Sequence, residues 1–214
     1  MEFKKSKEKF KNKKMNLPLE IIKHIICFVD SILYPVMYYL FPDILCIPPS
    51  SQQLNDLLRW ATKIGNKELC YLAKKWGATS FDWMLINATK EGHIYLCYLA
   101  KKWGAKNFDQ MIYWAARKNH EHLCCLAKKW GATDYNGMLC AASLNENEQL
   151  CYLAKKWGAT KFDIMLYYAA SFGNERLCHL AKKWGATDFN LMLSQAKRGN
   201  YKYLCQLAKK WGAY

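Results

Sequence analysis

A basic string that contains tryptophan, LAKKWGA, occurs six times in the chain, at a constant spacing of 27 residues. Each copy carries two neighbouring lysines, and lysine ammonium groups bind phosphates through charge. If the copies stack side by side, the pairs form a basic ridge about 50 Å long. The ridge consists of Lys74, Lys75, Lys101, Lys102, Lys128, Lys129, Lys155, Lys156, Lys182, Lys183, Lys209 and Lys210. Two interpretations stay open: the ridge holds nucleic acid or another polyanion such as acidic lipid, or one soluble motif was copied six times.

The lysine pairs account for the charge of the repeated region. The 214 residues contain 32 Lys and Arg against 17 Asp and Glu, a net charge of +15. Residues 54–214 hold 24 basic and 12 acidic residues, and the pairs supply 12 of the lysines. Without the pairs this region is neutral. A positive field of this kind gives attraction that is blind to sequence and sensitive to salt.

The remaining residues with chemical potential do not form a metal or catalytic site. In HEHLCC, His120 and Cys124 can share a helix face, but Cys124 recurs in every unit and structural zinc needs four ligands. The aspartates are assigned to helix caps, and no nucleophile–base pair or phosphate-binding glycine loop appears. We therefore expect neither an enzyme nor a bound metal or cofactor.

The repeats predict an all-α solenoid of helix–turn–helix units. The units are 54–80, 81–107, 108–134, 135–161, 162–188 and 189–214. The second residue of each unit is always Asp or Asn, and we expect it to be the N-cap of a first helix. These residues are Asn55, Asp82, Asp109, Asn136, Asp163 and Asn190.

Turn signals close both helices of each unit. The first helix is expected to end at a residue that tolerates the left-handed conformation, namely Gly65, Gly92, Asn119, Glu146, Gly173 or Asn200, of which only Glu146 is neither Gly nor Asn. A second helix follows, with Leu69, Cys70, Leu72, Ala73 and Trp76 of the first unit on one face. We expect the tryptophan to fill the space between adjacent units.

The cysteines predict a reducing compartment. Six of the ten recur at the repeat period, and equivalent positions in stacked helices lie about 8–10 Å apart, beyond the reach of a disulfide. We expect buried, reduced thiols and a cytoplasmic protein. The longest uncharged run, Ser31 to Pro42, has twelve residues, too few for a membrane span.

The repeats resemble those of the ankyrin family. GHIYLCYLAKKWGA, from Gly92 to Ala105, aligns without gaps with the second half of an ankyrin repeat, and MLINAT resembles its first helix. The family's Thr-Pro and His are missing, and the period is shorter than the family's by the length of its β-hairpin finger. The resemblance covers about three quarters of the chain, and it implies a protein-binding array with a reduced finger.

Positions that differ between units predict a target-binding strip. They match the variable contact sites of ankyrin arrays, where a fixed framework carries varied side chains. The strip consists of Ile64, Trp83, Lys90, Glu91, Gln110, Arg117, Lys118, Leu144, Phe172 and Arg198. A plain protein-binding repeat module without any other partner is one interpretation of this pattern.

The segment 16–53 resembles the opening of an F-box. By periodicity NLPLEIIKHIICFVD is a short amphipathic helix, and Leu17, Pro18, Ile21, Ile22 and Ile25 match the F-box pattern. The resemblance implies docking to a Skp-type adaptor of a cullin–RING ubiquitin ligase, and the alternative is a helical cap on the first repeat. Proteins that combine such a start with ankyrin repeats are multiplied in large DNA viruses.

The first fifteen residues form a separate basic tail. They contain seven lysines and are expected to be flexible, and they are suited to polyanion binding or to nuclear entry.

Together with the two family resemblances, the sequence predicts a non-catalytic adaptor in the cytoplasm, of a host cell if viral, or in the nucleus. Its repeats hold a target protein, and its F-box-like helix recruits a ubiquitin ligase.

Overall fold

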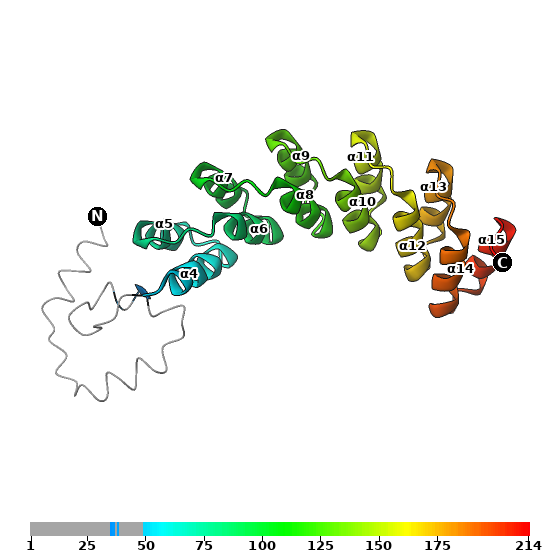
Figure 1. Ribbon diagram of the computed structural model, residues 1–214, viewed down its shortest axis with the longest axis horizontal. Coiled ribbons are helices and arrows are strands. Elements are labelled where there is room, and N and C mark those ends of the chain that lie inside the picture. The colour runs from blue at the N-terminus through cyan, green and yellow to red at the C-terminus, as the bar shows by residue number, and fades with distance from the viewer. Residues whose placement is uncertain (1–34, 37, 39–48) are drawn as a thin grey trace, which may run out of the picture. The chain divides into compact units, whose positions relative to one another are not determined.

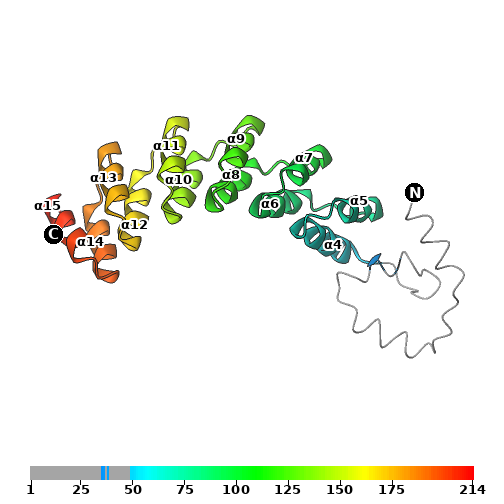
Figure 2. The same cartoon turned by 180° about the vertical axis from the view of Figure 1, so that it is seen from behind.

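The fold is an all-α solenoid of helix pairs (Figures 1 and 2). The computed structural model describes residues 35–36, 38 and 49–214, and within 49–214 it contains twelve helices and no strand. First helices of the repeats are α4 (Ser51–Lys63), α6 (Phe81–Glu91), α8 (Phe108–Arg117), α10 (Tyr135–Leu144), α12 (Phe162–Phe172) and α14 (Phe189–Arg198). Second helices are α5 (Lys67–Trp76), α7 (Ile94–Trp103), α9 (Glu121–Trp130), α11 (Glu148–Trp157), α13 (Glu175–Trp184) and α15 (Lys202–Lys210).

The chain divides into two compact units, 1–87 and 88–214, with the boundary inside α6. In the first unit, α4 begins at a capping box, where the Ser50 side chain and the Gln53 side chain each accept the other's backbone N–H. Helix α4 packs against α5. Its buried face carries Leu54, Leu57 and Leu58.

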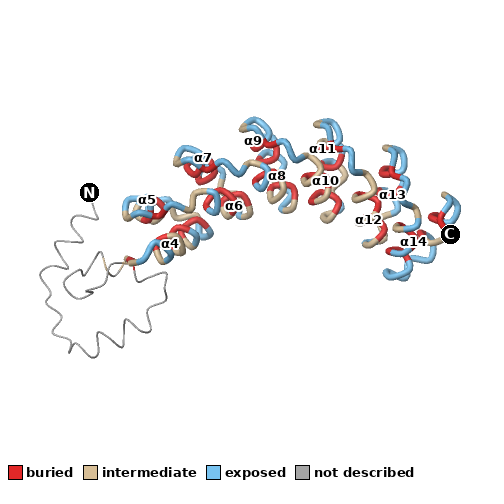
Figure 3. Tube along the Cα trace, in the orientation of Figure 1, coloured by how far each residue is buried: buried red, intermediate tan, exposed pale blue. Residues whose placement is uncertain are grey.

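In the second unit the first helices form a continuous layer. Helix α8 packs on α10, α10 on α12, and α12 on α14, while each first helix also packs on its own second helix. Met111, Met138, Met165 and Met192 are fully buried at equivalent positions of this layer. Figure 3 shows that burial is concentrated where the two helices of a pair meet, whereas the outer ends of the second helices are exposed.

The predicted N-caps are wrong. Asp109, Asn136, Asp163 and Asn190 lie one residue past the helix start, and Asn55 lies four residues past the start of α4. The side-chain caps are instead Ser50, Asn107, Asp134 and Asp188. Helix α12 begins after Lys161, whose side chain makes no capping hydrogen bond, and Asp82 likewise lies within α6 rather than before it.

The misassigned Asp and Asn residues join consecutive repeats. Asp109 Oδ1 accepts hydrogen bonds from the backbone N–H groups of Thr133 (2.6 Å) and Asp134 (2.9 Å), which lead into the next first helix. Asn136 Oδ1 makes the same pair of contacts, to the N–H groups of Thr160 (2.8 Å) and Lys161 (3.0 Å). Only Oδ1 is used, which explains why the chain accepts either Asp or Asn here.

These contacts predict a sharp difference between two substitutions of Asp109. Asp109→Leu removes the acceptor of two backbone N–H groups and should cost about 1–2 kcal/mol of unfolding free energy. Asp109→Asn should change the unfolding free energy by less than about 0.5 kcal/mol, because Asn136 already makes this contact. Urea unfolding followed by circular dichroism measures both, and equal losses for the two variants would contradict the assignment.

The predicted left-handed turns are confirmed. Gly65, Gly92 and Gly173 have φ between 72° and 78°, and Asn119, Glu146 and Asn200 have φ between 55° and 59°. The second helices end at glycines with φ of 110–116°. Glu146 stands out because a glutamate Cβ is strained in this conformation.

Glu146→Asn should therefore stabilise the protein by about 0.5–1 kcal/mol. Asparagine tolerates φ near 55°, and its side-chain oxygen replaces the acceptor that Glu146 Oε2 offers to Asn174 Nδ2. Asn119 occupies the equivalent turn of the preceding repeat and already makes this contact, because its Oδ1 accepts a hydrogen bond from Asn147 Nδ2 at 3.0 Å. The matched reverse change, Asn119→Glu, should lower thermal stability by a similar amount, and no change in either variant would exclude strain at this turn.

The repeated cysteines are free thiols, as expected. Cys70, Cys97, Cys124, Cys151 and Cys178 are fully buried. The sixth, Cys205, is half-buried, which differs from the expected complete burial. Burial raises the pKa of Cys97 and Cys151 to about 11 and of Cys124 and Cys178 to about 12, so these thiols stay protonated at neutral pH.

Candidate functional site

The predicted adaptor-binding residues lie outside the part of the chain that the structure describes. Leu17, Pro18, Ile21, Ile22 and Ile25 all belong to residues 1–34. Docking of this segment to a ligase adaptor therefore stays a prediction.

The target-binding strip is largely accessible to solvent. In the first unit Ile64 and Trp83 are 50% and 52% exposed, and the Arg59 guanidinium lies 5.4 Å from the Trp83 ring centroid. In the second unit the exposed members are Glu91, Gln110, Lys118, Phe172 and Arg198, and the half-buried ones are Lys90, Arg117 and Leu144.

The two half-buried basic residues of the strip are held by neighbouring repeats. The Lys90 ammonium lies 3.7 Å from the centroid of the Trp114 ring, a cation–π contact. Burial, and then the charge of Lys118, lower the pKa of Lys90. Arg117 donates to the side-chain oxygen of Asn145, and Asn145 donates back to the Arg117 carbonyl. The strip is therefore partly ordered before any target arrives.

Two aromatic pairs beside the strip were missed by the sequence reasoning. Tyr113 and Trp114 of α8 meet edge to face at 5.4 Å, and Tyr167 and Tyr168 of α12 do so at 5.0 Å, all half-buried. Partial burial and a hydrogen bond with the Cys140 thiol raise the pKa of Tyr168 to about 12. The signal was available, because aromatic pairs follow the buried Met-Ile and Met-Leu pairs in only the third and fifth units.

The two lysines of each pair have different environments. The first lysine reaches over two aromatic rings of the following repeat: Lys155 Nζ lies 4.7 Å from the centroid of the Trp184 ring and 5.8 Å from that of Phe162. The same arrangement, with 4.4–4.6 Å to the tryptophan ring, recurs at Lys101, Lys128 and Lys182. We call these four residues the first-lysine set.

The aromatic contacts of the first-lysine set confirm that tryptophan lies between repeats. Trp184 meets Tyr152 of the preceding second helix at 5.0 Å and Phe162 at 5.6 Å, both edge to face. Trp130 makes equivalent contacts with Tyr98 and Phe108. The first lysine is thus part of the contact between repeats.

Both lysines of each pair are exposed, but the second has no such aromatic contact. We call Lys102, Lys129, Lys156, Lys183 and Lys210 the second-lysine row. None of these five lysines forms an ion pair with another residue of the described part of the chain. One ammonium group per repeat is therefore exposed with neither an aromatic nor an ionic partner among the described residues.

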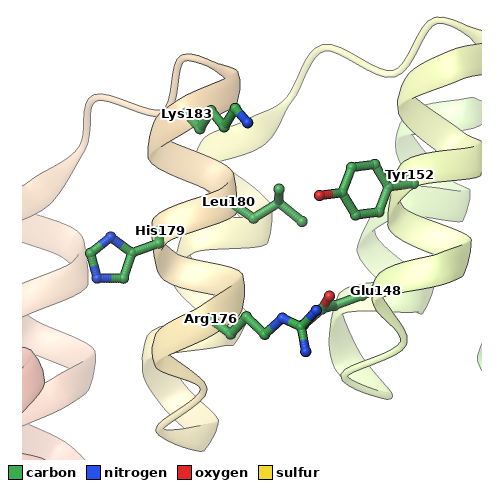
Figure 4. Close-up of a pocket in the computed structure, with 6 residues that line it drawn as sticks. All are labelled: Glu148, Tyr152, Arg176, His179, Leu180 and Lys183. Atoms are coloured by element: carbon green, nitrogen blue, oxygen red, sulfur yellow. The ribbon is translucent and has the colours of Figure 1, made fainter.

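A shallow hollow lies between the second helices α11 and α13 (Figure 4). Its volume is about 170 Å³, well below that of a usual small-molecule site, and it has room for one side chain or one ring system. Tyr152 projects from α11 towards Leu180 on α13, with Lys183 at one end and the Arg176–Glu148 ion pair, at 2.8 Å, at the other.

Residues 49–214 show no other recognisable centre. No group of three His, Cys, Asp or Glu side chains among them comes together as metal ligands, and none of their helices is both long and apolar enough to cross a bilayer. In HEHLCC, the Cys124 thiol points to the Ile112 carbonyl, whereas His120 Nε2 lies 3.4 Å from the Lys90 carbonyl.

Neither protein-family models nor curated proteins give a match to this chain. Its function is therefore inferred from the two surfaces described above, the strip with its aromatic neighbours and the second-lysine row.

Proposed function

We propose that the protein is a non-catalytic adaptor whose helical repeats, of an ankyrin-like class, bind a target protein through the strip at the ends of the first helices. One observation carries the proposal: the framework recurs from repeat to repeat and is buried, while the strip varies and is largely exposed. Met111, Met138 and Met165 are identical and buried, whereas the exposed residues Glu91, Lys118 and Phe172 occupy one equivalent position with three chemistries.

The aromatic pairs add the anchors that such a surface needs. Interface energy is concentrated in a few aromatic and arginine side chains with partly protected surroundings. Tyr113, Trp114, Tyr167 and Tyr168 are half-buried next to the strip, and Arg117 is fixed by Asn145. These residues offer a rigid surface at low entropic cost to a bound target.

The proposal extends to the segment 16–53, which would bring the target to a cullin–RING ubiquitin ligase. Support comes from the sequence pattern around Leu17, Ile21 and Ile22. The combination of this pattern with ankyrin-like repeats is typical of viral proteins, so we propose that the protein acts in the host cytoplasm or, through its basic tail, in the nucleus. Without this docking, the molecule is a plain protein-binding repeat module.

The test is affinity capture from host-cell lysate with three matched baits. The wild-type chain should recover a target and a Skp-type adaptor with its cullin. The triple variant Leu17→Asp, Ile21→Asp, Ile22→Asp should lose the adaptor and keep the target. The double variant Lys118→Glu, Phe172→Ala should lose the target and keep the adaptor.

Two results would overturn parts of this proposal. Absence of adaptor and cullin from the wild-type capture removes the ligase link and leaves a plain binding module. A captured protein retained by the strip variant shows that the strip is not the recognition surface. Gln149→Ala, on the exposed side of α11, is the control and should recover everything.

A further inference from the structure

The second-lysine row forms a basic track along the second helices, and the acidic side chains of the same repeats do not neutralise it. Glu121, Glu148 and Glu175 lie in the first turns of α9, α11 and α13, whereas the row occupies the last turns, about 12 Å further along each helix. The loop carboxylates Asp134 and Asp188 are engaged as helix N-caps, accepting from the N–H groups of Gly137 and Leu191.

The spacing of the row suits a phosphodiester chain. First helices of neighbouring repeats pack roughly 10 Å apart, and the second helices, which make fewer contacts with one another, repeat the lysines at this distance or somewhat more. A nucleic acid strand carries a phosphate every few ångströms, so that each flexible lysine reaches one without a fixed register. Residues 88–214 hold 19 basic and nine acidic residues, which adds a long-range attraction for such a chain.

Exposed tyrosines accompany the lysines. Tyr98 and Tyr152 lie one helical turn before Lys102 and Lys156, and their side chains are 52% and 51% exposed. Tyr152 also forms a wall of the hollow that ends at Lys183 (Figure 4). An aromatic face beside a lysine is the arrangement on which the bases of a single strand stack while its phosphates are neutralised.

We propose that the second-lysine row binds single-stranded nucleic acid, with phosphates on the lysines and bases stacked on Tyr98 and Tyr152. The tyrosines decide between polyanions. The bases of a duplex are already stacked inside the helix and do not stack on a tyrosine ring. Lipid headgroups offer no planar group that could stack on such a ring. The binding is independent of sequence and of the target-binding strip, which lies at the ends of the other helices.

The chain supplies a charge-matched control for this proposal. One full-length variant changes Lys102, Lys129, Lys156 and Lys183 to Gln, and a second changes the first-lysine set, Lys101, Lys128, Lys155 and Lys182, to Gln. Both lose four charges and both keep the basic tail of residues 1–15, so a difference between them reports position rather than net charge. The probe is a fluorescein-labelled oligo(dT) of about 30 nucleotides. It is titrated with protein, and binding is followed by fluorescence anisotropy at about 50 to about 300 mM NaCl.

The second-lysine variant should bind about 100-fold more weakly at about 150 mM salt, and the slope of log K against log salt should fall by about 3. The first-lysine variant should keep affinity within about threefold, while its melting temperature falls by about 5–10 °C through the lost cation–π contacts. The double variant Tyr98→Leu, Tyr152→Leu should lose about tenfold in affinity, with Tyr98→Phe, Tyr152→Phe as its silent control.

Three results overturn the proposal. Equal weakening by the two lysine variants shows that net charge alone attracts the probe. Equal binding of a 30-base-pair duplex, or displacement of the probe by vesicles with about 30% phosphatidylserine at matched charge, assigns the track to a duplex or to a lipid surface. Unchanged affinity in the second-lysine variant places any binding on the basic tail.

Discussion

Trp184→Ala is expected to lower the free energy of unfolding by about 2–3 kcal/mol, near the lower end of the range for large core truncations, because the ring is half-buried. The ring contacts Tyr152, Phe162 and the Lys155 ammonium, all within 6 Å. Its removal takes away the contacts of the fifth repeat with Tyr152 and Lys155 of the fourth and also leaves a cavity. Urea unfolding followed by circular dichroism gives the change.

The chain contains the control for this substitution. Trp157 has the equivalent lysine and ring, Lys128 and Tyr135, but Cys125 stands where Tyr98 and Tyr152 stand in other repeats. Trp157→Ala should therefore cost about 1 kcal/mol less than Trp184→Ala. Cys125→Tyr should add the missing edge-to-face contact and raise stability by about 0.5–1 kcal/mol. Identical losses at the two tryptophans would show that the tyrosine contributes nothing.

Alkaline solution should unfold the protein at a pH where ordinary helical proteins stay folded. In the unfolded chain a thiol has a pKa near 8.5, whereas burial holds the pKa of Cys97 and Cys151 at about 11 and of Cys124 and Cys178 at about 12. Between about pH 9 and 11 the unfolded state therefore binds fewer protons than the folded state, and stability falls as pH rises. Each thiol contributes about 1.4 kcal/mol per pH unit, and the four together up to about 5 kcal/mol per unit.

The measurement is the urea midpoint at pH 7, 8, 9 and 10, as approximate settings. The midpoint should be nearly constant up to about pH 8 and should then fall steeply. The variant Cys124→Ala, Cys178→Ala is less stable at neutral pH, but its stability should fall with about half the steepness above pH 9. An unchanged slope in that variant assigns the alkaline loss to the lysines or tyrosines instead.

The architecture was predictable from the sequence because it is encoded locally and repeated six times. The left-handed turns at Asn119 and Gly173 and the glycine stops follow from single residue types, and the position of tryptophan follows from helical periodicity. The N-caps were wrong because Asp or Asn before an apolar pair is compatible with two roles. The backbone N–H groups that Asp109 binds lie 24 and 25 residues away, and a pattern of a few neighbouring residues does not predict such a contact.

The candidate surfaces were predictable only in part. Solvent exposure of Lys118 and Phe172 follows from variation between otherwise identical units. The different environments of Lys155 and Lys156 do not follow from it, because two adjacent lysines on one helix look equivalent until the following repeat supplies Phe162 and Trp184. The contribution of Tyr152 could not be predicted for the same reason, since the hollow that it lines is formed by two second helices of different repeats.

The contacts between repeats also set how this molecule can change in length. The hydrogen bonds that join one repeat to the next within 88–214 connect residues 24 to 30 positions apart. The contacts of the tryptophan, of the first lysine and of the Asp or Asn recur at equivalent positions of successive repeats. Removing or inserting one whole unit of 27 residues recreates a junction of the same kind, so that stability is lost or gained in steps of similar size. Low contact order of this kind also favours fast folding from any internal pair of repeats. Gene duplication can thus lengthen the molecule without redesigning a single junction.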